Sequence, residues 1–341
     1  HKHYEEFYGV KLSEEAGWKI PEMFDAAIDG RLKAMWLMGE DVVQTDPDSE
    51  HVKHAMESLE FLVVQEIFMT ETAQFANVIL PASSFLEKSG TFTNAERRVQ
   101  KVNASVKPLE GTRPDGQIMC EIMQRFGYPQ PDYTPDGMLA EIAQIVPFFK
   151  GATWENLGDN GKQWPIKEDG TDTQILHTQS FTRGLGKFHF FPWKESTELV
   201  THRGEFPFIL TTGRLLEHYN CGTMTRRTGN EQIVSEDLLA IHPDDAAKKG
   251  IEDGEKVRLF SARGDVELRA RITDEVKPGI LYTTFHFPEA MVNNVTGQGC
   301  DADTLCPEYK VVAADVERIT EGFIRKKKRK ISVEPALSAH V

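Results

Sequence analysis

The chain has 341 residues, a formal net charge of −14 and 40% hydrophobic residues. This length allows two or three domains with a sizeable core, and the acidic balance argues against a general nucleic-acid binder. No run of about 18 uncharged apolar residues is present, so we expect no transmembrane segment. The first residues carry no apolar signal region, so we expect no secretory leader. The four cysteines suit neither a disulfide-rich scaffold nor a paired CxxC metal site, which favours a reducing, cytoplasmic location.

Residues 1–110 alternate short apolar runs with helical patterns. The runs cover 33–39, 61–65 and 77–81, and they are separated by helical spacing over 48–59 and by a short helix over 70–76. This alternation is typical of βαβ units and predicts a parallel, doubly wound α/β sheet. Ligands of such sheets bind beyond the carboxyl ends of the strands. Gly39–Glu40, Gln65–Glu66 and Pro81–Ala82 occupy those ends.

Residues 111–204 read as a helical and then irregular connecting region. Apolar residues at i, i+4 spacing predict helices over 115–126 and 136–146, the first with Asp115 at the N-cap position. From about 148 to 198 the chain is rich in Gly, Trp, Asp and Thr. We expect this stretch to be a long connecting segment on the surface.

Residues 205–320 change to β character. Six strands are expected, over 206–212, 238–242, 256–261, 265–272, 280–287 and 310–316, with one helical turn over 244–250. Short strands at this spacing predict a closed barrel. Residues 321–341 then form a basic tail with the run RKKKRK at 325–330. We interpret this tail as a solvated extension, with an address or an anion-binding tail as alternatives.

Common motifs of self-contained enzymes are absent from the sequence. It has no GxGxxG after a strand, no P-loop, no GxSxG and no HExxH. Two polar clusters remain. Residues 87–100 form either a loop that holds a phosphate or a polar ring, or a surface loop with Glu–Arg pairs.

The second cluster, 211–227, follows a predicted strand. Gly213 permits close backbone approach there, and Arg214 can bind a phosphate or carboxylate. His218 and Tyr219 could stack on a flat ring. The cluster therefore points to a nucleotide-like ligand, with a plain barrel-edge loop as the alternative.

Eight motifs in order give the chain a resemblance to a known family. Together they cover about residues 30–320 and read MGEDVVQTDPD, VVQEIFMTETAQFANVILP, EKSGTFTNAERRVQ, RPDGQIMCEIMQRFGYP, TTGRLLEHYNCGTMTRR, HPDDAAKKGI, VNNVTG and CPEYKVVAADVERI. The chain resembles the C-terminal half of a molybdenum or tungsten formate dehydrogenase of the bis-molybdopterin guanine dinucleotide oxidoreductase family. The resemblance implies a six-stranded double-psi β-barrel for residues 205–320 and part of a dinucleotide-binding α/β domain for residues 1–110.

The resemblance also implies which residues hold the cofactor. In the α/β region the matching positions are Gly39, Glu40, Gln65, Glu66, Lys88 and Asp115. In the barrel they are Thr212, Gly213, Arg214, Leu216, Glu217, His218, Tyr219, Asn293 and Lys310. Carboxylates such as Glu66 and Asp115 can accept from the guanine edge, while Lys88 and Arg214 suit anionic oxygens.

One departure from the family pattern affects the predicted activity. The family's N-terminal half carries a four-cysteine [4Fe-4S] motif, a Cys or selenocysteine metal ligand followed by His, and a catalytic Arg, and none of these is found here. We therefore predict no catalytic or metal-ligating residue in this chain. The resemblance implies that an N-terminal portion, on the same or a separate chain, supplies the catalytic centre.

The expected cofactor is bis-molybdopterin guanine dinucleotide with Mo or W, and the expected reaction interconverts formate and CO2. Iron–sulfur or NAD-reducing electron-transfer subunits are the expected partners. Two alternatives remain open at this point. One is the catalytic chain of a nitrate reductase of the same family. The other is a non-catalytic scaffold related to the iron–sulfur subunit of respiratory complex I.

Overall fold

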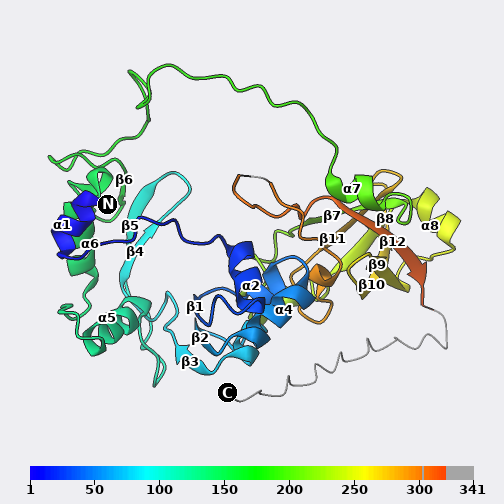
Figure 1. Ribbon diagram of the computed structural model, residues 1–341, viewed down its shortest axis with the longest axis horizontal. Helices are drawn as coiled ribbons and strands as arrows, with labels where there is room; N and C mark the ends of the chain where they lie inside the picture. The colour runs from blue at the N-terminus through cyan, green and yellow to red at the C-terminus, as the bar shows by residue number, and fades with distance from the viewer. Residues whose placement is uncertain (302, 320–341) are drawn as a thin grey trace, which may run out of the picture.

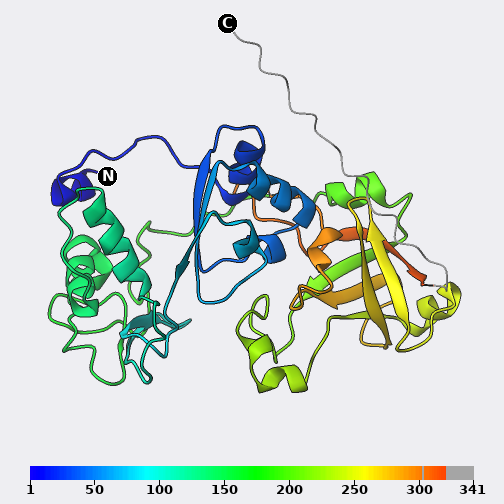
Figure 2. The ribbon, with the colours of Figure 1, turned by 90° about the horizontal axis from the view of Figure 1, so that it is seen from below.

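A computed structural model describes residues 1–301 and 303–319 of the chain, so the predicted basic tail over 321–341 lies outside the described residues. A central parallel sheet lies between a hairpin-and-helix unit and a β-barrel (Figures 1 and 2). In the described part of the chain, no helix is long and apolar enough to cross a membrane.

The central sheet has three parallel strands in the order β1-β2-β3. The strands are β1 (Ala34–Met38), β2 (Phe61–Glu66) and β3 (Val78–Pro81). Helices α2 (Ile20–Ile28), α3 (Val42–Thr45) and α4 (Ser49–Ser58) and the 3₁₀ turn η1 (Thr72–Phe75) accompany them. Apolar side chains of these elements form one core, which includes Phe24, Val52, Met56, Leu62 and Val64. The predicted parallel α/β sheet is therefore confirmed.

Local capping explains where the elements of the sheet region begin. Asp48 accepts a hydrogen bond from the backbone N–H of His51 and so caps α4. The Thr70 hydroxyl accepts a hydrogen bond from the backbone N–H of Ala73 at 3.2 Å, just before η1 begins. The register pairs Met38 with Gln65 and Glu66 with Pro81, which brings the three carboxyl ends to one edge.

The hairpin-and-helix unit contains the first polar cluster. Its elements are α1 (Lys2–Tyr8), β4 (Gly90–Thr93), β5 (Arg98–Val102), α5 (Asp115–Arg125), α6 (Pro135–Ile145), η2 (Pro147–Phe149) and β6 (Lys162–Gln163). The expectation of a loop over 87–100 is wrong, because β4 and β5 pair as an antiparallel hairpin and β6 adds to β5. At the turn of the hairpin, the Glu96 carboxylate pairs with Arg98 at 2.7 Å. The alternative of a surface segment with Glu–Arg pairs therefore describes this turn better than a phosphate-binding loop.

The connecting segment is shorter than the sequence suggested. Ala152, Leu157 and Ile166 are buried in a small core with Val99 of the hairpin and Leu139 of α6. Residues up to about 173 therefore belong to the folded unit, and Thr173 closes it with a backbone hydrogen bond to Gln163. The extended part that remains leads to the barrel, as the arch in Figure 1 shows.

The barrel is closed by six strands in the order β10-β8-β11-β7-β12-β9. They are β7 (Phe208–Gly213), β8 (Leu238–Ile241), β9 (Lys256–Ser261), β10 (Asp265–Ile272), β11 (Ile280–Thr284) and β12 (Val312–Arg318). The short helical elements are α7 (Thr197–His202), η3 (Thr225–Arg227), η4 (Gly229–Gln232), α8 (Pro243–Lys249) and η5 (Val292–Asn294). Two strand pairs, β10–β8 and β11–β7, are parallel. The predicted six-stranded barrel is confirmed.

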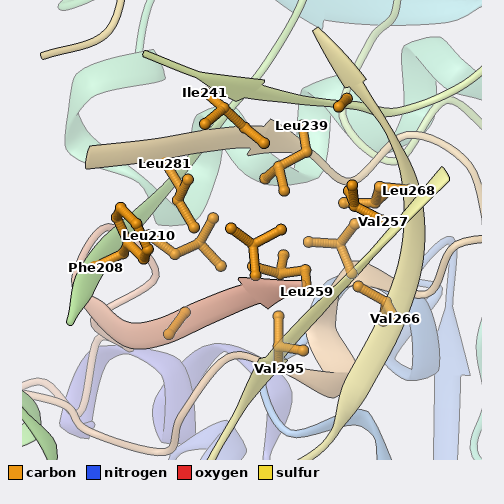
Figure 3. Close-up of a cluster of buried hydrophobic side chains, with 14 of the residues drawn as sticks. Phe208, Leu210, Leu239, Ile241, Val257, Leu259, Val266, Leu268, Leu281 and Val295 are labelled. Carbon is orange, nitrogen blue, oxygen red and sulfur yellow. The ribbon is translucent and has the colours of Figure 1, made fainter. Parts of the chain in front are cut away.

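Alternation along the strands fills the barrel interior. In β7 and β9 every second residue is buried, as expected when one face of each strand faces the core. The inward side chains include Leu210, Leu239, Leu259 and Leu281, which meet in the centre (Figure 3). This packed core fixes the strand ends on which the site is built.

Two buried amides connect the barrel to the sheet region. The Asn293 side chain donates to the backbone carbonyls of Gln44 at 2.7 Å and Thr45 at 3.0 Å. In return, the Gln44 side chain donates to the carbonyls of Cys221 and Phe285. These bonds join residues far apart in the chain and hold α3 against the barrel.

Candidate functional site

A cavity of about 920 Å³ lies between the carboxyl edge of the sheet and the end of β7. This volume is near the upper end of the roughly 300–1,000 Å³ that ligand pockets span. Ten of the fifteen predicted cofactor-binding residues line it, from both bodies: Gly39, Glu40, Gln65, Glu66, Lys88, Asp115, Thr212, Arg214, Tyr219 and Lys310. The structure thus brings most of the candidate residues together around one space.

The sheet side of the cavity presents carboxylates and an unpaired amide oxygen. Gly39 has φ 66°, a conformation that favours glycine, and its N–H bonds the Gln65 carbonyl at 2.9 Å. Burial raises the pKa of the neighbouring Glu66 carboxyl above its ordinary value. The buried Gln65 side chain donates to Asp115 at 2.8 Å, while its Oε1 has no hydrogen-bond partner among the described residues. A buried acceptor left without a donor costs about 1–3 kcal/mol, so Gln65 points to a donor on a ligand.

Asp115 is occupied by protein partners rather than free for a ligand. One of its oxygens accepts from Gln65, and the other pairs with the ammonium of Lys88. The Lys88 and Asp115 side chains are 23% and 34% exposed, so the pair is partly shielded from water. Asp115 therefore orients Lys88 and Gln65 on the wall, and Glu66 is the better placed acceptor for a ligand.

The barrel side of the cavity presents cations. Arg214 follows β7 and its guanidinium lies 5.9 Å from the centre of the Phe285 ring. Lys310 bonds the Thr212 carbonyl, and the Thr212 hydroxyl donates to the Tyr309 carbonyl at 2.9 Å. The cavity is therefore acidic on the sheet side and basic on the barrel side. Such a pair of walls suits a ligand with N–H donors at one end and anionic oxygens at the other.

Five predicted residues do not line this cavity: Gly213, Leu216, Glu217, His218 and Asn293. A Cβ on Gly213 would lie 2.3 Å from the Tyr282 hydroxyl, so a larger residue there would have to displace the end of the Tyr282 side chain. His218 is buried, and its ring nitrogens bond the Thr225 hydroxyl and the Val234 carbonyl, which does not fit the expected stacking on a ligand. Asn293 is committed to the connection with α3.

Leu216 and Glu217 lie in the same loop, outside this cavity. Leu216 is fully exposed, and the backbone carbonyl of Glu217 accepts a hydrogen bond from Asn230. Contact of these two residues with a cofactor stays a prediction.

His286 holds the loop that carries Arg214 and Tyr219, and the sequence reasoning missed it. Its Nε2 accepts from the Leu215 backbone N–H at 3.0 Å, and its Nδ1 donates to the Asn220 carbonyl at 2.6 Å. These two bonds require the neutral Nδ1–H tautomer. Burial lowers the pKa of the His286 imidazole, in agreement with a neutral ring.

Buried Asp237 supports His286 from behind. Its carboxylate accepts from the Thr284 hydroxyl and from the backbone N–H groups of His286 and Phe287 at 3.1 and 3.0 Å. Burial is also the main reason why the pKa of the Asp237 carboxyl is raised. A histidine near the end of the predicted strand 280–287 was the available sequence signal for this arrangement.

Aromatic side chains also line the cavity and were not predicted. Phe85 and Phe92 lie 6.3 Å apart between ring centres, and Tyr309 and Phe285 contribute from the barrel side. Phe85 and Phe92 also border an adjoining cavity of about 260 Å³. Phe92 belongs to the hairpin that had been expected to be a loop, which is why its position on the wall was not foreseen.

Family models match two parts of the chain. The Molybdopterin oxidoreductase model matches residues 6–125, and the Molydopterin dinucleotide binding domain model matches residues 208–313. The first range covers the sheet side of the cavity, and the second covers most of the barrel.

Relatives of the chain carry formate dehydrogenase names. The F420-dependent formate dehydrogenase subunit alpha of Methanocaldococcus jannaschii is 40% identical over 94% of this chain and 48% of its own length. The F420-dependent formate dehydrogenase 1 subunit alpha of Methanococcus maripaludis is 38% identical over the same shares. The chain thus spans about half the length of these relatives.

A solved structure shares the fold. The acetylene hydratase from Pelobacter acetylenicus aligns with a TM-score of 0.66 at 17% identity, over 93% of this chain and 49% of that chain. At this identity the likeness concerns the fold alone. With both domain models matched in order and relatives at 40% identity along nearly its whole length, the chain belongs to the molybdopterin oxidoreductase family.

Proposed function

We propose that this chain is the cofactor-holding part of a formate dehydrogenase that binds a molybdopterin guanine dinucleotide between its sheet and its barrel. The observation that carries the proposal is the cavity with a carboxylate and amide wall on one side and a cationic wall on the other. Family membership names the ligand class, and the names of the 38–40% identical relatives favour formate as the substrate.

The residues on the sheet side fit the guanine end. Guanine presents N–H donors, and the half-buried Glu66 carboxylate is an acceptor for them. The unpaired Oε1 of Gln65 supplies a second acceptor on the same wall. Since hydrogen bonds to a carboxylate favour its charged form, a bound guanine would offset the burial that raises the pKa of Glu66.

The residues on the barrel side fit the pyrophosphate. Arg214 can place its planar donors against two phosphate oxygens, and Lys310 adds a point charge beside it. Neither cation is paired with a carboxylate across the cavity in the described chain, unlike Lys88, which is held by Asp115. Arg214 and Lys310 therefore are the cations that we assign to the phosphates.

The complete cofactor would be bis-molybdopterin guanine dinucleotide with Mo or W. When bound, it supplies the two-electron chemistry that interconverts formate and CO2, while the protein supplies position and electrostatics. We assign the metal ligand and a [4Fe-4S] cluster to the part of the enzyme that this chain does not cover.

An electron-transfer subunit is the proposed partner. It would be an iron–sulfur or NAD-reducing subunit, and because both relatives are named F420-dependent, F420 should be tested beside NAD as the acceptor.

The test is a substrate assay on the intact enzyme that contains this chain. We expect formate-dependent reduction of a viologen dye and no nitrate-dependent oxidation of the reduced dye. Nitrate turnover would move the chain to the nitrate reductases of the family. Absence of both activities in metal-loaded, cluster-loaded enzyme would favour the scaffold alternative.

A matched pair of arginine variants connects this activity to the cavity. Arg214→Ala should lower the cofactor content and therefore the rate. Arg271→Ala is the control, because Arg271 lies on the outside of the barrel and pairs with Glu275. Equal effects of the two substitutions would contradict the phosphate role of Arg214.

A further inference from the structure

A long stretch between the folded unit and the barrel exposes its aromatic side chains. Every residue from 177 to 195, here called the aromatic strap, is exposed. Four aromatic residues within the six positions 188–193 are 79 to 101% exposed: Phe188, Phe190, Phe191 and Trp193. The strap is the arch above the molecule in Figure 1.

The apolar area on the strap is larger than a free surface normally carries. Each large aromatic side chain can bury about 150–250 Å². The four rings together with Phe181, which is 60% exposed, thus present on the order of 700 Å². The largest apolar patch of a typical monomer is roughly 300–600 Å², and one side of a standard protein interface is about 800 Å². The strap alone comes close to one side of an interface.

The strap also has few backbone hydrogen bonds within the described chain, and its three cations have no ion-pair partner there. Among the described residues, the strap forms one backbone–backbone hydrogen bond, from the Gly184 N–H to the Phe181 carbonyl. The strap carries three cations, Arg183, Lys187 and Lys194, and one carboxylate at its end, Glu195, which pairs with Arg203 at 2.5 Å, although the whole chain has a net charge of −14. An extended segment with open backbone groups can be satisfied by a surface that offers hydrogen bonds and apolar pockets.

We propose that the aromatic strap docks into an apolar, carboxylate-flanked groove on the portion of the enzyme that this chain does not cover. The chain spans about half the length of its relatives, so an additional protein body of similar size is available to cover the strap. A lipid surface fits less well, because it offers no fixed hydrogen-bond partners for an irregular backbone. The inference rests on family membership, and it does not depend on formate being the substrate.

Limited trypsin digestion tests the docking, because three cleavable bonds lie inside the strap, and those after Arg183 and Lys187 are the most central. In the 341-residue chain alone, cleavage after Arg183 and Lys187 should be rapid. In the intact enzyme, cleavage at these two sites should be slower by about tenfold or more, since a docked segment must open before it is cut. The cut sites are read by mass spectrometry.

Substitutions in the strap then test the aromatic contacts. Phe190→Ser and Trp193→Ser should restore rapid cleavage after Lys187 in the intact enzyme. They should leave the folding of the 341-residue chain unchanged, because both side chains contact solvent there. Phe126→Ser is the matched control, since Phe126 directly follows α5, is 87% exposed and lies outside the strap.

Three outcomes would overturn the proposal. They are equal cleavage rates in the chain alone and the intact enzyme, equal effects of the strap variants and Phe126→Ser, or protection of the lone chain by phosphatidylglycerol vesicles. The last result would assign the strap to a membrane surface. Since digestion does not depend on cofactor content or formate turnover, failure here is distinguishable from failure of the proposed function.

Discussion

Replacing Asn293 by alanine should separate a structural role from a cofactor role. The Asn293 amide donates to the carbonyls of Gln44 and Thr45 and is 2% exposed. Its removal leaves two carbonyls without their donor, at about 1–3 kcal/mol for each buried group. We therefore expect Asn293→Ala to lower the free energy of unfolding by about 2–6 kcal/mol.

The assay is urea unfolding of the 341-residue chain, together with the guanine nucleotide content of the folded intact enzyme. The control is Asn230→Ala, which removes an amide-to-carbonyl bond to Glu217 at a partly exposed site and should cost about 0.5–1.5 kcal/mol. Unchanged stability with a large loss of nucleotide would contradict a structural role for Asn293. It would make Asn293 the cofactor ligand that the family resemblance implied.

Three further predictions concern the cavity, the loop that borders it and the partly buried carboxyl group of Asp46, which follows α3. Arg214→Ala should lower the nucleotide content more than the melting temperature; a lower melting temperature at full content would make the residue structural. His286→Phe should weaken nucleotide retention even in folded protein, because the Leu215 N–H and the Asn220 carbonyl lose their partner. His286→Gln should restore part of the retention. Equal retention in the wild type and both variants would contradict a positioning role for His286. Burial raises the pKa of Asp46 to about 6, so the stability of the chain should fall as pH rises from about 4 through 6. Asp46→Asn should reduce that slope, to which Glu66 and Asp237 also contribute, and raise stability at pH 7 by about 1–3 kcal/mol in urea unfolding; an unchanged slope would contradict this assignment.

The fold could be predicted largely because its strands carry local signals. Apolar and polar residues alternate over 256–261 and 265–272. This alternation predicts half-buried strands, and the structure has β9 and β10 at these residues. The apolar runs before Gly39 and Pro81 likewise predicted β1 and β3. These patterns are local, so they are readable without knowing what each strand pairs with.

The hairpin was missed because its pattern depends on distant partners. The pairs of β4 are close in sequence, but β6 joins β5 from about 60 residues away and covers only two residues. The polar composition of 87–100 is equally compatible with a loop. The packing of Val99 in β5 against Leu139 and Ile166 stabilises the strand instead.

Residue type and position in a motif did not distinguish residues that line the cavity from residues that hold the surrounding loops in place. His218 and Tyr219 are adjacent, yet Tyr219 faces the cavity while His218 is bound to the Val234 carbonyl. Asn293 finds its partners about 250 residues earlier in the chain. Such long-range hydrogen bonds carry no local sequence signature, so only the structure separates these roles.

The central claim is that the cavity between sheet and barrel holds a guanine dinucleotide. It is tested most directly by measuring GMP after acid hydrolysis of the intact enzyme, with molybdenum and tungsten determined on the same sample. We expect about two GMP and one metal per enzyme particle, with GMP lost in Arg214→Ala and kept in Arg271→Ala. Intact, full-mass enzyme without GMP and without metal would contradict it.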